Sequence, residues 1–187
     1  FADLYTSDPE KFPAEARDGA YLRRLKASYP IHPEVFERLY EDWSTLPKFQ
    51  RTRGVLRLMA RLIHSLWRED NRDLLVLPGS IPLDDLSVRN ELVKYLPTGW
   101  DALIDKDIDG SHASPREIDD STPALGSVQA CRRAARTIFL GSSPSVSGQK
   151  VRGIGIERVR LGCAQPGQSA SKYDDALRRL GDRLHYL

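Results

Sequence analysis

The segment that decides the fold is Gln50–Glu69, with the sequence QRTRGVLRLMARLIHSLWRE. At about 100° per residue of helix, five of its basic side chains project within roughly 40° of one direction. They are Arg53, Arg57, Arg61, His64 and Arg68. The opposite side carries Val55, Met59, Leu62, Ile63, Leu66 and Trp67. The pattern predicts an amphipathic helix that buries its apolar side in a core and carries a narrow row of positive charge opposite.

No acidic residue relieves this row, because Trp43–Arg68 contains neither Asp nor Glu. Arg53 and Arg57, like Arg57 and Arg61, are spaced i,i+4. Each such pair of like charges destabilises an isolated helix by about 0.2–0.5 kcal/mol. Two interpretations stay open: a solvated surface, or a row that binds an anion such as a nucleotide phosphate, a nucleic acid or an acidic partner.

Charge is segregated along the whole chain. The 187 residues are 40% apolar and 29% charged, which is typical of one globular domain or two small ones, and the net charge is only +2. A second acid-free window, from Ser121 to Ile156, holds further basic residues. They are Arg132, Arg133, Arg136, Lys150 and Arg152. The acids cluster at 84–85, 101–109 and 119–120.

Several bulk features narrow the class of protein. No apolar run reaches the roughly 20 residues that span a bilayer, and no signal-peptide pattern is present, so we expect a cytoplasmic protein without membrane association. Cys131 and Cys163 lie far apart without CxxC spacing, which predicts buried free thiols. The start at Phe1 and the apolar end at 184–187 predict a piece of a longer protein.

The first part of the chain predicts a helical bundle. Helices are expected over 14–28, from Pro33 to Leu46, and over 50–69, because prolines and apolar spacing mark their limits. Short connections between three such helices favour an antiparallel arrangement over residues 1–72.

The second part, residues 73–187, predicts a mixture of helices and short strands. Strands are expected at 74–77 and 156–163, where apolar and polar residues alternate in the latter. Helices are expected from Asp84 or Asp85 to 96, over 127–140, and after a cap at Ser169 or Ser171. Residues 105–126 are expected to form turns and 141–153 a loop. The predicted fold is therefore mainly α with a small β component: a helical bundle followed by a winged-helix-like α/β module.

Motifs for chemistry are weak. The segment 141–150 departs from a phosphate-binding loop in its glycine spacing and has Val151 where Ser or Thr belongs. Asp105–Gly110 resembles the start of an EF-hand loop, but Arg116 occupies the position of the bidentate Glu. An acidic turn with Gly110 at positive φ explains this segment. The four histidines have no metal spacing, so we predict neither a catalytic set nor a metal site.

The second group of arginines raises a nucleic-acid hypothesis. Arg132, Arg133 and Arg136, followed by Lys150 and Arg152 in a glycine-rich loop and then a basic strand, would suit a winged-helix DNA reader. A solvated helix face is the competing interpretation.

Five stretches together resemble a family of large bacterial and archaeal AAA+ ATP-binding proteins, catalogued as domain of unknown function 499. They are Tyr29-Pro-Ile-His-Pro-Glu34, Tyr40-Glu-Asp-Trp-Ser44, Phe49-Gln-Arg-Thr-Arg-Gly-Val-Leu-Arg-Leu-Met59, Arg136-Thr-Ile-Phe-Leu-Gly141 and Arg158-Val-Arg-Leu-Gly-Cys163. The resemblance implies a P-loop ATPase whose nucleotide-binding core lies upstream of Phe1. Residues 1–72 would be its helical lid.

The resemblance also implies roles for particular residues. Gly54-Val-Leu-Arg57 is similar to the setting of the lid's sensor arginine, so Arg57 would contact the terminal phosphates of ATP, with Arg53 and Arg61 in support. ATP and Mg²⁺ would be cofactors of the full-length protein and not be held tightly by this piece. The implied function is a lid fragment that senses nucleotide state and couples hydrolysis to action on a macromolecule, in a DNA-related setting and as a ring-forming homo-oligomer. The alternative is a nucleic-acid-binding module without a nucleotide role.

Overall fold

The computed structural model describes residues 1–144 and 153–184. The α-helices are α1 (Ala2–Ser7), α2 (Gly19–Ser28), α3 (Pro33–Glu37), α4 (Arg51–Arg68), α5 (Leu86–Val93), α6 (Trp100–Leu103), α7 (Ser114–Ser121), α8 (Pro123–Gly126), α9 (Ala130–Ser142), α10 (Ile156–Leu161) and α11 (Ser171–Arg183). Short 3₁₀ or π turns are η1 (Ala14–Arg17), η2 (Arg38–Asp42), η3 (Trp43–Thr45), η4 (Pro78–Ser80) and η5 (Ile104–Ile108).

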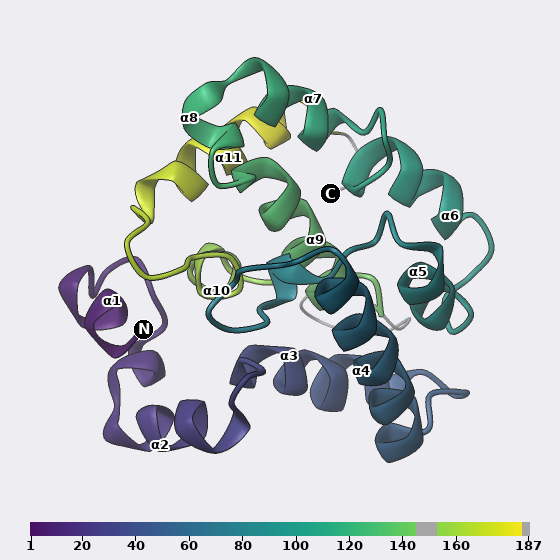
Figure 1. Cartoon of the computed structure of the whole chain (residues 1–187), viewed down its shortest axis with the longest axis horizontal. Helices are drawn as coiled ribbons and strands as arrows, with labels where there is room; N and C mark the ends of the chain where they lie inside the picture. The colour runs from purple at the N-terminus through teal and green to yellow at the C-terminus, as the bar shows by residue number, and fades with distance from the viewer. Residues whose placement is uncertain (145–152, 185–187) are drawn as a thin grey trace.

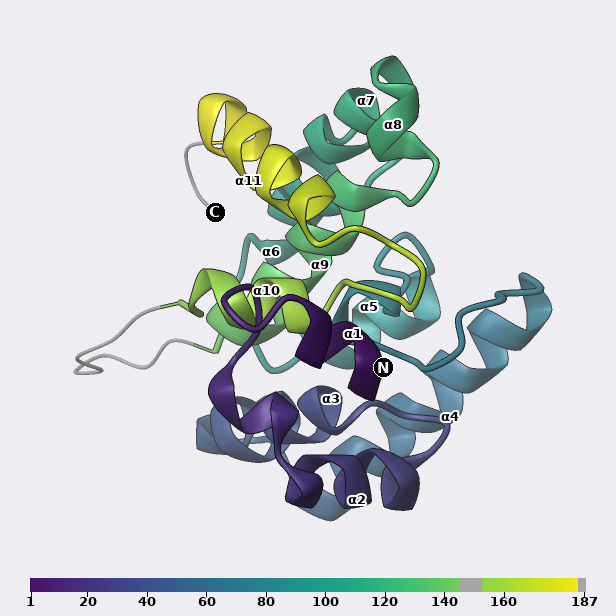
Figure 2. The same ribbon diagram turned by 90° about the vertical axis from the view of Figure 1, so that its left-hand side faces the viewer.

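Helix α9 occupies the middle of the molecule. In both views α7, α8 and α11 lie on one side of it and α2, α3 and α4 on the other (Figures 1 and 2). Ten of its thirteen residues are buried, which is why this helix organises the fold. The indole nitrogen of Trp43 donates a hydrogen bond to the carbonyl of Leu140 at 2.8 Å, so η3 is fixed to the end of α9.

The core consists of two apolar clusters that meet along α9. One contains Tyr5 and Tyr21 together with residues of α7, α9, α10 and α11. The other contains Trp43, Leu58 and Leu92 together with Phe139 of α9. Each cluster draws on residues from both sides of the predicted boundary at residue 72. The division into domains 1–72 and 73–187 stays a prediction. Neither apolar cluster is confined to one of these two parts.

The prediction of a mainly helical protein is confirmed, but that of a β component is wrong. In the described ranges the β pairing amounts to an isolated parallel bridge between Ile31 and Val76, at the segment expected to be a strand. The second expected strand is the helix α10. A winged-helix module is therefore not supported.

Helix α10 shows why the alternation of apolar and polar residues led to a wrong prediction of a strand at 156–163. Residues 159–165 are all buried. The alternation of apolar and basic residues around Arg160 therefore does not separate a buried face from a solvent-exposed face. The Arg160 guanidinium donates to Asp174 of α11 at 2.6 Å and that of Arg158 donates to Glu34 of α3 at 2.9 Å. Paired arginines are compatible with burial, and six residues are too few for periodicity to separate a helix from a strand.

The turn-rich interpretation of 105–126 is also wrong, because α7 and α8 lie there. Pro115 stands in the first turn of α7, where its missing N–H costs nothing, and Pro123 does the same in α8. The helix expected over 14–28 is interrupted at Asp18, which has extended backbone angles. Helices α3, α4, α5, α9 and α11 occupy segments predicted to be helical, although Ser169 and Ser171 bond to each other and do not cap α11.

Candidate functional site

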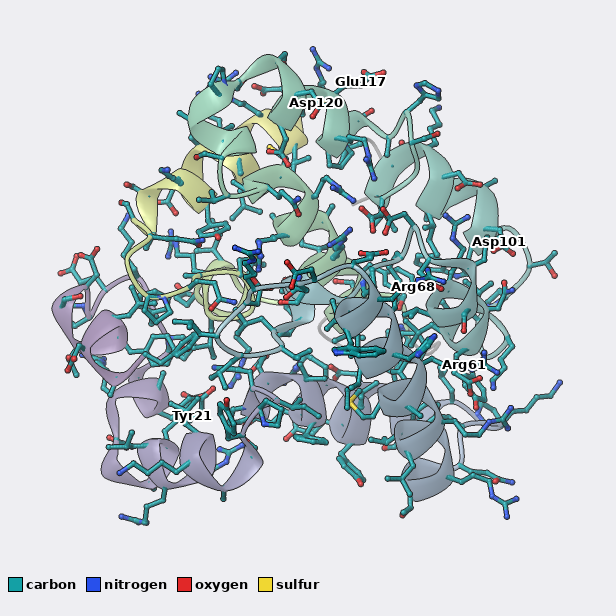
Figure 3. All side chains as sticks on the ribbon, in the orientation of Figure 1. Tyr21, Arg61, Arg68, Asp101, Glu117 and Asp120 are labelled. Atoms are coloured by element: carbon teal, nitrogen blue, oxygen red, sulfur yellow. The ribbon has the colours of Figure 1, made fainter. Side chains whose placement is uncertain are left out.

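Helix α4 is the most strongly amphipathic long helix and presents the predicted arginine row. Its buried side consists of five apolar residues in the second core cluster: Val55, Leu58, Met59, Leu62 and Leu66. The helix contacts α5 and η2, and its opposite side faces away from both cores. Figure 3 labels Arg61 and Arg68, which lie along α4 on the side of α5.

The row receives its counter-charge from α5. The carboxylate of Glu91, only 3% exposed, lies 3.5 Å from Nε of Arg57 and 3.2 Å from Nε of Arg61. Lys94 forms a third ion pair with the same carboxylate. One buried anion is thus shared by three cations, which relieves the i,i+4 repulsion within α4 but leaves positive charge in excess.

The C-terminal end of the row is held by the N-cap of α5. Asp85 accepts hydrogen bonds from the amides of Ser87 and Val88, from the Ser65 hydroxyl at 2.8 Å, and from Arg68 at 3.1 Å. Partial burial opposes ionisation of Asp85, but these hydrogen bonds and the charge of Arg68 outweigh it and lower its pKa.

The three predicted sensor residues are not equivalent. Arg61 is committed to α5, because its guanidinium also donates to the Ser87 hydroxyl at 2.7 Å. Arg57 remains 56% exposed, and its 3.5 Å approach to Glu91 is an ion pair too long for a strong hydrogen bond. Arg53 is exposed and has no ion pair with any residue in the described ranges. Of the three predicted sensor residues, Arg53 and Arg57 therefore retain more free donor capacity than Arg61 does.

The predicted core face of α4 needs a correction. Ile63 and Trp67 were expected to be buried, but they are 48% and 81% exposed. Leu56 is 64% exposed on the same side. The apolar residues of α4 cover a wider part of its circumference than the part that is buried. Because α4 packs at the edge of the molecule, the rest of its apolar surface faces solvent.

Arg132, Arg133 and Arg136 were predicted to contact nucleic acid or to form a solvated helix face, and their positions in the structure favour neither. All three are buried. Arg132 and Arg136 both bind Asp109, at 3.0 and 2.7 Å, and Arg133 binds Asp73 at 2.5 Å. At least one donor of each arginine is used inside the protein, but Nε and Nη1 of Arg133 are buried without a hydrogen-bond partner among the described residues. Lys150 and Arg152, the other predicted nucleic-acid contacts, lie outside the described residues.

The acidic turn at 105–110 supplies an anion to the interior. Asp109 is fully buried and also accepts hydrogen bonds from the amides of Leu83 and Asp84. Gly110 was predicted to have a positive φ, and this prediction is wrong. A Cβ atom there would lie 2.1 Å from the carbonyl oxygen of Asp105, so close approach of two backbone segments is what requires glycine.

Metal and thiol chemistry find little support. Among the residues the structure describes, no group of three or more His, Cys, Asp or Glu side chains could hold a metal ion. Cys131 and Cys163 are free and buried, as predicted. Burial raises the pKa of Cys163 to about 12, so this thiol stays protonated and unreactive at neutral pH.

Comparison with known proteins identifies the family. A sequence model described as the DUF499 second domain matches residues 15–153, which is most of the chain. The chain belongs to the DUF499 family. No curated protein and no solved structure matches it.

The matched segment carries the whole site. It includes α4 and α5, and it also includes the buried pairs between α9 and Asp109. In the described part of this DUF499 domain, none of the helices has the length and apolar character needed to cross a lipid bilayer.

Proposed function

We propose that this DUF499 domain is the lid of an AAA+-type ATPase and that α4 senses nucleotide state through Arg57. The observation that carries the proposal is the half-exposed arginine row on α4, in which Arg57 is held near Glu91 without a close hydrogen bond. ATP and Mg²⁺ would be held by a P-loop core in another part of the protein. The DUF499 domain would add the sensor and, by moving, would couple hydrolysis to a macromolecule.

The charge balance around Glu91 favours an incoming anion. Three cations share one carboxylate, so Arg57 can leave Glu91 while Arg61 and Lys94 still compensate it. A buried carboxylate stripped of every cation would be costly, whereas losing one of three is tolerable. A terminal phosphate offers charge-assisted hydrogen bonds to guanidinium N–H groups at about 2.7–2.9 Å. Arg57 is therefore suited to exchange an intramolecular partner for a nucleotide.

Arg53 and Arg61 have different supporting roles in this proposal. Arg53, one turn before Arg57, adds toward the same anion a second guanidinium, which has no ion pair within residues 1–144 and 153–184. Arg61 stays on Glu91 and Ser87 and keeps α5 attached to α4 when Arg57 moves. Gly54 lies between Arg53 and Arg57, in the Gly-x-x-Arg setting that suggested the sensor role.

The test is ATP hydrolysis by the full-length protein. Arg57→Ala is expected to lower kcat by about tenfold or more, because contacts to transition-state charge act on turnover more than on binding. The KM for ATP should change by less than about threefold. Arg72→Ala is the matched control, since Arg72 is an exposed arginine that pairs only with Asp70 in the described structure. Equal turnover of the Arg57 and Arg72 variants would remove Arg57 from this role.

The nucleic-acid alternative receives less support than the lid. Arg132, Arg133 and Arg136, which were to carry it, are engaged with Asp73, Asp84 and Asp109. Contacts to the phosphates of DNA need exposed donors, whereas these three side chains are buried and paired with carboxylates of the same chain. An action on DNA by the full-length protein would have to use other residues.

A further inference from the structure

The exposed side of α4 carries a line of large apolar residues. Leu56, Ile63 and Trp67 are separated by seven and four residues, so at about 100° per residue they fall within roughly 40° of one another. Ala60, also exposed, lies between Leu56 and Ile63 along the helix axis and about 20° beyond Trp67 around it. With a rise of 1.5 Å per residue the line extends about 16 Å. We call these four residues the apolar stripe. Single exposed apolar residues are ordinary, but an aligned set on one helix marks an interaction site.

The arginine row borders this stripe on one side only. Arg53 begins about 60° round the helix from Leu56, and the remaining arginines continue away from the stripe toward α5. Because Arg61 and Arg68 are tied to Ser87 and Asp85, the positive charge nearest the stripe belongs to Arg53 and Arg57. A partner of this surface must therefore match a line of apolar residues that has positive charge along one edge.

We propose that the apolar stripe docks an amphipathic helix of a partner protein, whose acidic residues lie along the edge that faces Arg53 and Arg57. Spacing of i, i+4, i+7 and i+11 is how one helix presents anchors to another. Burial of Trp67 and Ile63 would supply most of the affinity, as aromatic and aliphatic anchors do at interfaces. Acidic residues at the border would set the orientation of the bound helix.

A second copy of this chain fits the surface poorly. Helix α4 contains no Asp or Glu, so no pairing of two α4 helices would bring a carboxylate of α4 to either arginine row. An antiparallel pair about a twofold axis would place the two rows against each other. Repulsion between like charges therefore favours an acidic partner over self-association.

A lipid surface fits poorly as well. Helices that lie in a membrane interface bury a wide apolar face with cationic residues beside it. The apolar stripe is one residue wide, and Arg61 and Arg68 bend toward α5, away from any plane that the stripe could enter. A nucleic acid would use the arginines but would leave Leu56, Ile63 and Trp67 in water.

The test uses a designed peptide and the intrinsic fluorescence of Trp67. The probe is an 18-residue helical peptide with leucines at i, i+4, i+7 and i+11, glutamates along one flank, and a fluorescein label. Trp43 is buried and Trp100 is partly buried, whereas Trp67 is 81% exposed, so docking should shift the tryptophan emission of this chain to shorter wavelength. Anisotropy of the label should rise saturably and weaken as NaCl is added.

Matched variants and probes separate the outcomes. Ile63→Ala combined with Trp67→Ala should weaken peptide binding by about tenfold or more, while Leu74→Ala, which truncates another exposed leucine, should leave it unchanged. Circular dichroism should show the same helix content in each variant. A peptide with every glutamate replaced by lysine should bind at least about tenfold more weakly.

Four results would each overturn the proposal. These are equal binding of the acidic and lysine peptides, undiminished binding by the double variant, no binding of the acidic peptide, and a preference for phosphatidylglycerol vesicles or for self-association by sedimentation. No nucleotide enters the experiment and Arg57 is left intact. Its failure would therefore leave the proposed ATP-sensing role standing, and loss of that role would leave this docking site testable.

Discussion

Arg136 and Asp109 form a bidentate ion pair in the interior, with Nε donating to one carboxylate oxygen at 2.7 Å and a terminal nitrogen donating to the other at 2.8 Å. Asp109 is fully buried and also binds Arg132. The pair joins the turn after η5 to α9, the central helix. Cationic residues that look like a binding surface in the sequence are therefore part of the framework that holds the domain together.

Removing the charge of Asp109 should destabilise the domain strongly. Asp109→Asn leaves Arg132 and Arg136 buried with less counter-charge, and breaking a buried pair from one side costs about 3–5 kcal/mol. The free energy of unfolding from urea denaturation measures this. Asp70→Asn, which removes an exposed carboxylate paired with Arg72, should cost less than about 1 kcal/mol. Similar losses in the two variants would contradict a framework role for Asp109.

Removing the charge of Glu91 should make stability depend on salt. In Glu91→Gln the side chains of Arg57, Arg61 and Lys94 lose their common anion, and repulsion between them is screened by added salt. We expect a loss of about 1–3 kcal/mol in the free energy of unfolding at low salt. The loss should shrink in 0.5 M NaCl. A loss that is the same at both salt concentrations would mean that charge is not its cause.

Two glycines should respond to alanine with opposite signs. Gly110→Ala would bring Cβ to 2.1 Å from the backbone oxygen of Asp105, so the turn must shift and the domain should lose more than about 2 kcal/mol. Gly181 lies within α11 with no neighbouring atom near its missing Cβ, so Gly181→Ala should stabilise by about 0.5–1 kcal/mol. Thermal denaturation of both variants tests the pair. A stabilising change at Gly110 would refute the close approach inferred there.

His32 should make the domain sensitive to mild acid. Burial, reinforced by the charge of Arg24, lowers the pKa of His32 to about 3 from an ordinary value of 6.5. Between about pH 6.5 and 3 the unfolded chain binds a proton that the folded chain does not. Stability therefore falls as the pH is lowered through this window, by at most about 1.4 kcal/mol per pH unit.

A variant isolates this effect from the other titrating groups. Nδ1 of His32 accepts the Glu34 amide at the start of α3, and Asn can accept the same hydrogen bond without titrating. His32→Asn should lose Tyr5 as a partner at all pH values, yet the loss of stability between pH 7 and 4.5 should be smaller than in the unchanged protein by about 2–3 kcal/mol. Parallel pH profiles would contradict the assignment.

The part of the fold that could be predicted is the part where one helix has a long run of periodic residues. The bounds of α4 follow from eighteen residues of amphipathic spacing, and Pro33 and Asp85 mark helix starts by their own chemistry. Helix α10, with six residues, offers too short a pattern. The apolar residues of α4 indicate the direction of its buried side, but the width of that side depends on the packing of α5 and η2. For this reason the sequence wrongly predicts that Ile63 and Trp67 are buried.

The partners of the arginines could be inferred only in outline. The acid clusters at 84–85 and 101–109 supply Asp84 and Asp109 to the arginines of α9, but Glu91, which pairs with the arginines of α4, lies outside every acid cluster. Which arginine becomes buried depends on how α9 is enclosed by its neighbours. Exposure of Arg57 and burial of Arg136 are properties of tertiary packing and not of either helix alone.

The most direct measurement is a structure of the full-length DUF499 protein with a non-hydrolysable ATP analogue and Mg²⁺. The account predicts that a guanidinium nitrogen of Arg57 lies about 2.7–2.9 Å from a terminal phosphate oxygen, with Arg61 still paired to Glu91. A nucleotide-bound structure in which Arg57 remains beside Glu91 and α4 lies remote from the phosphates would contradict it.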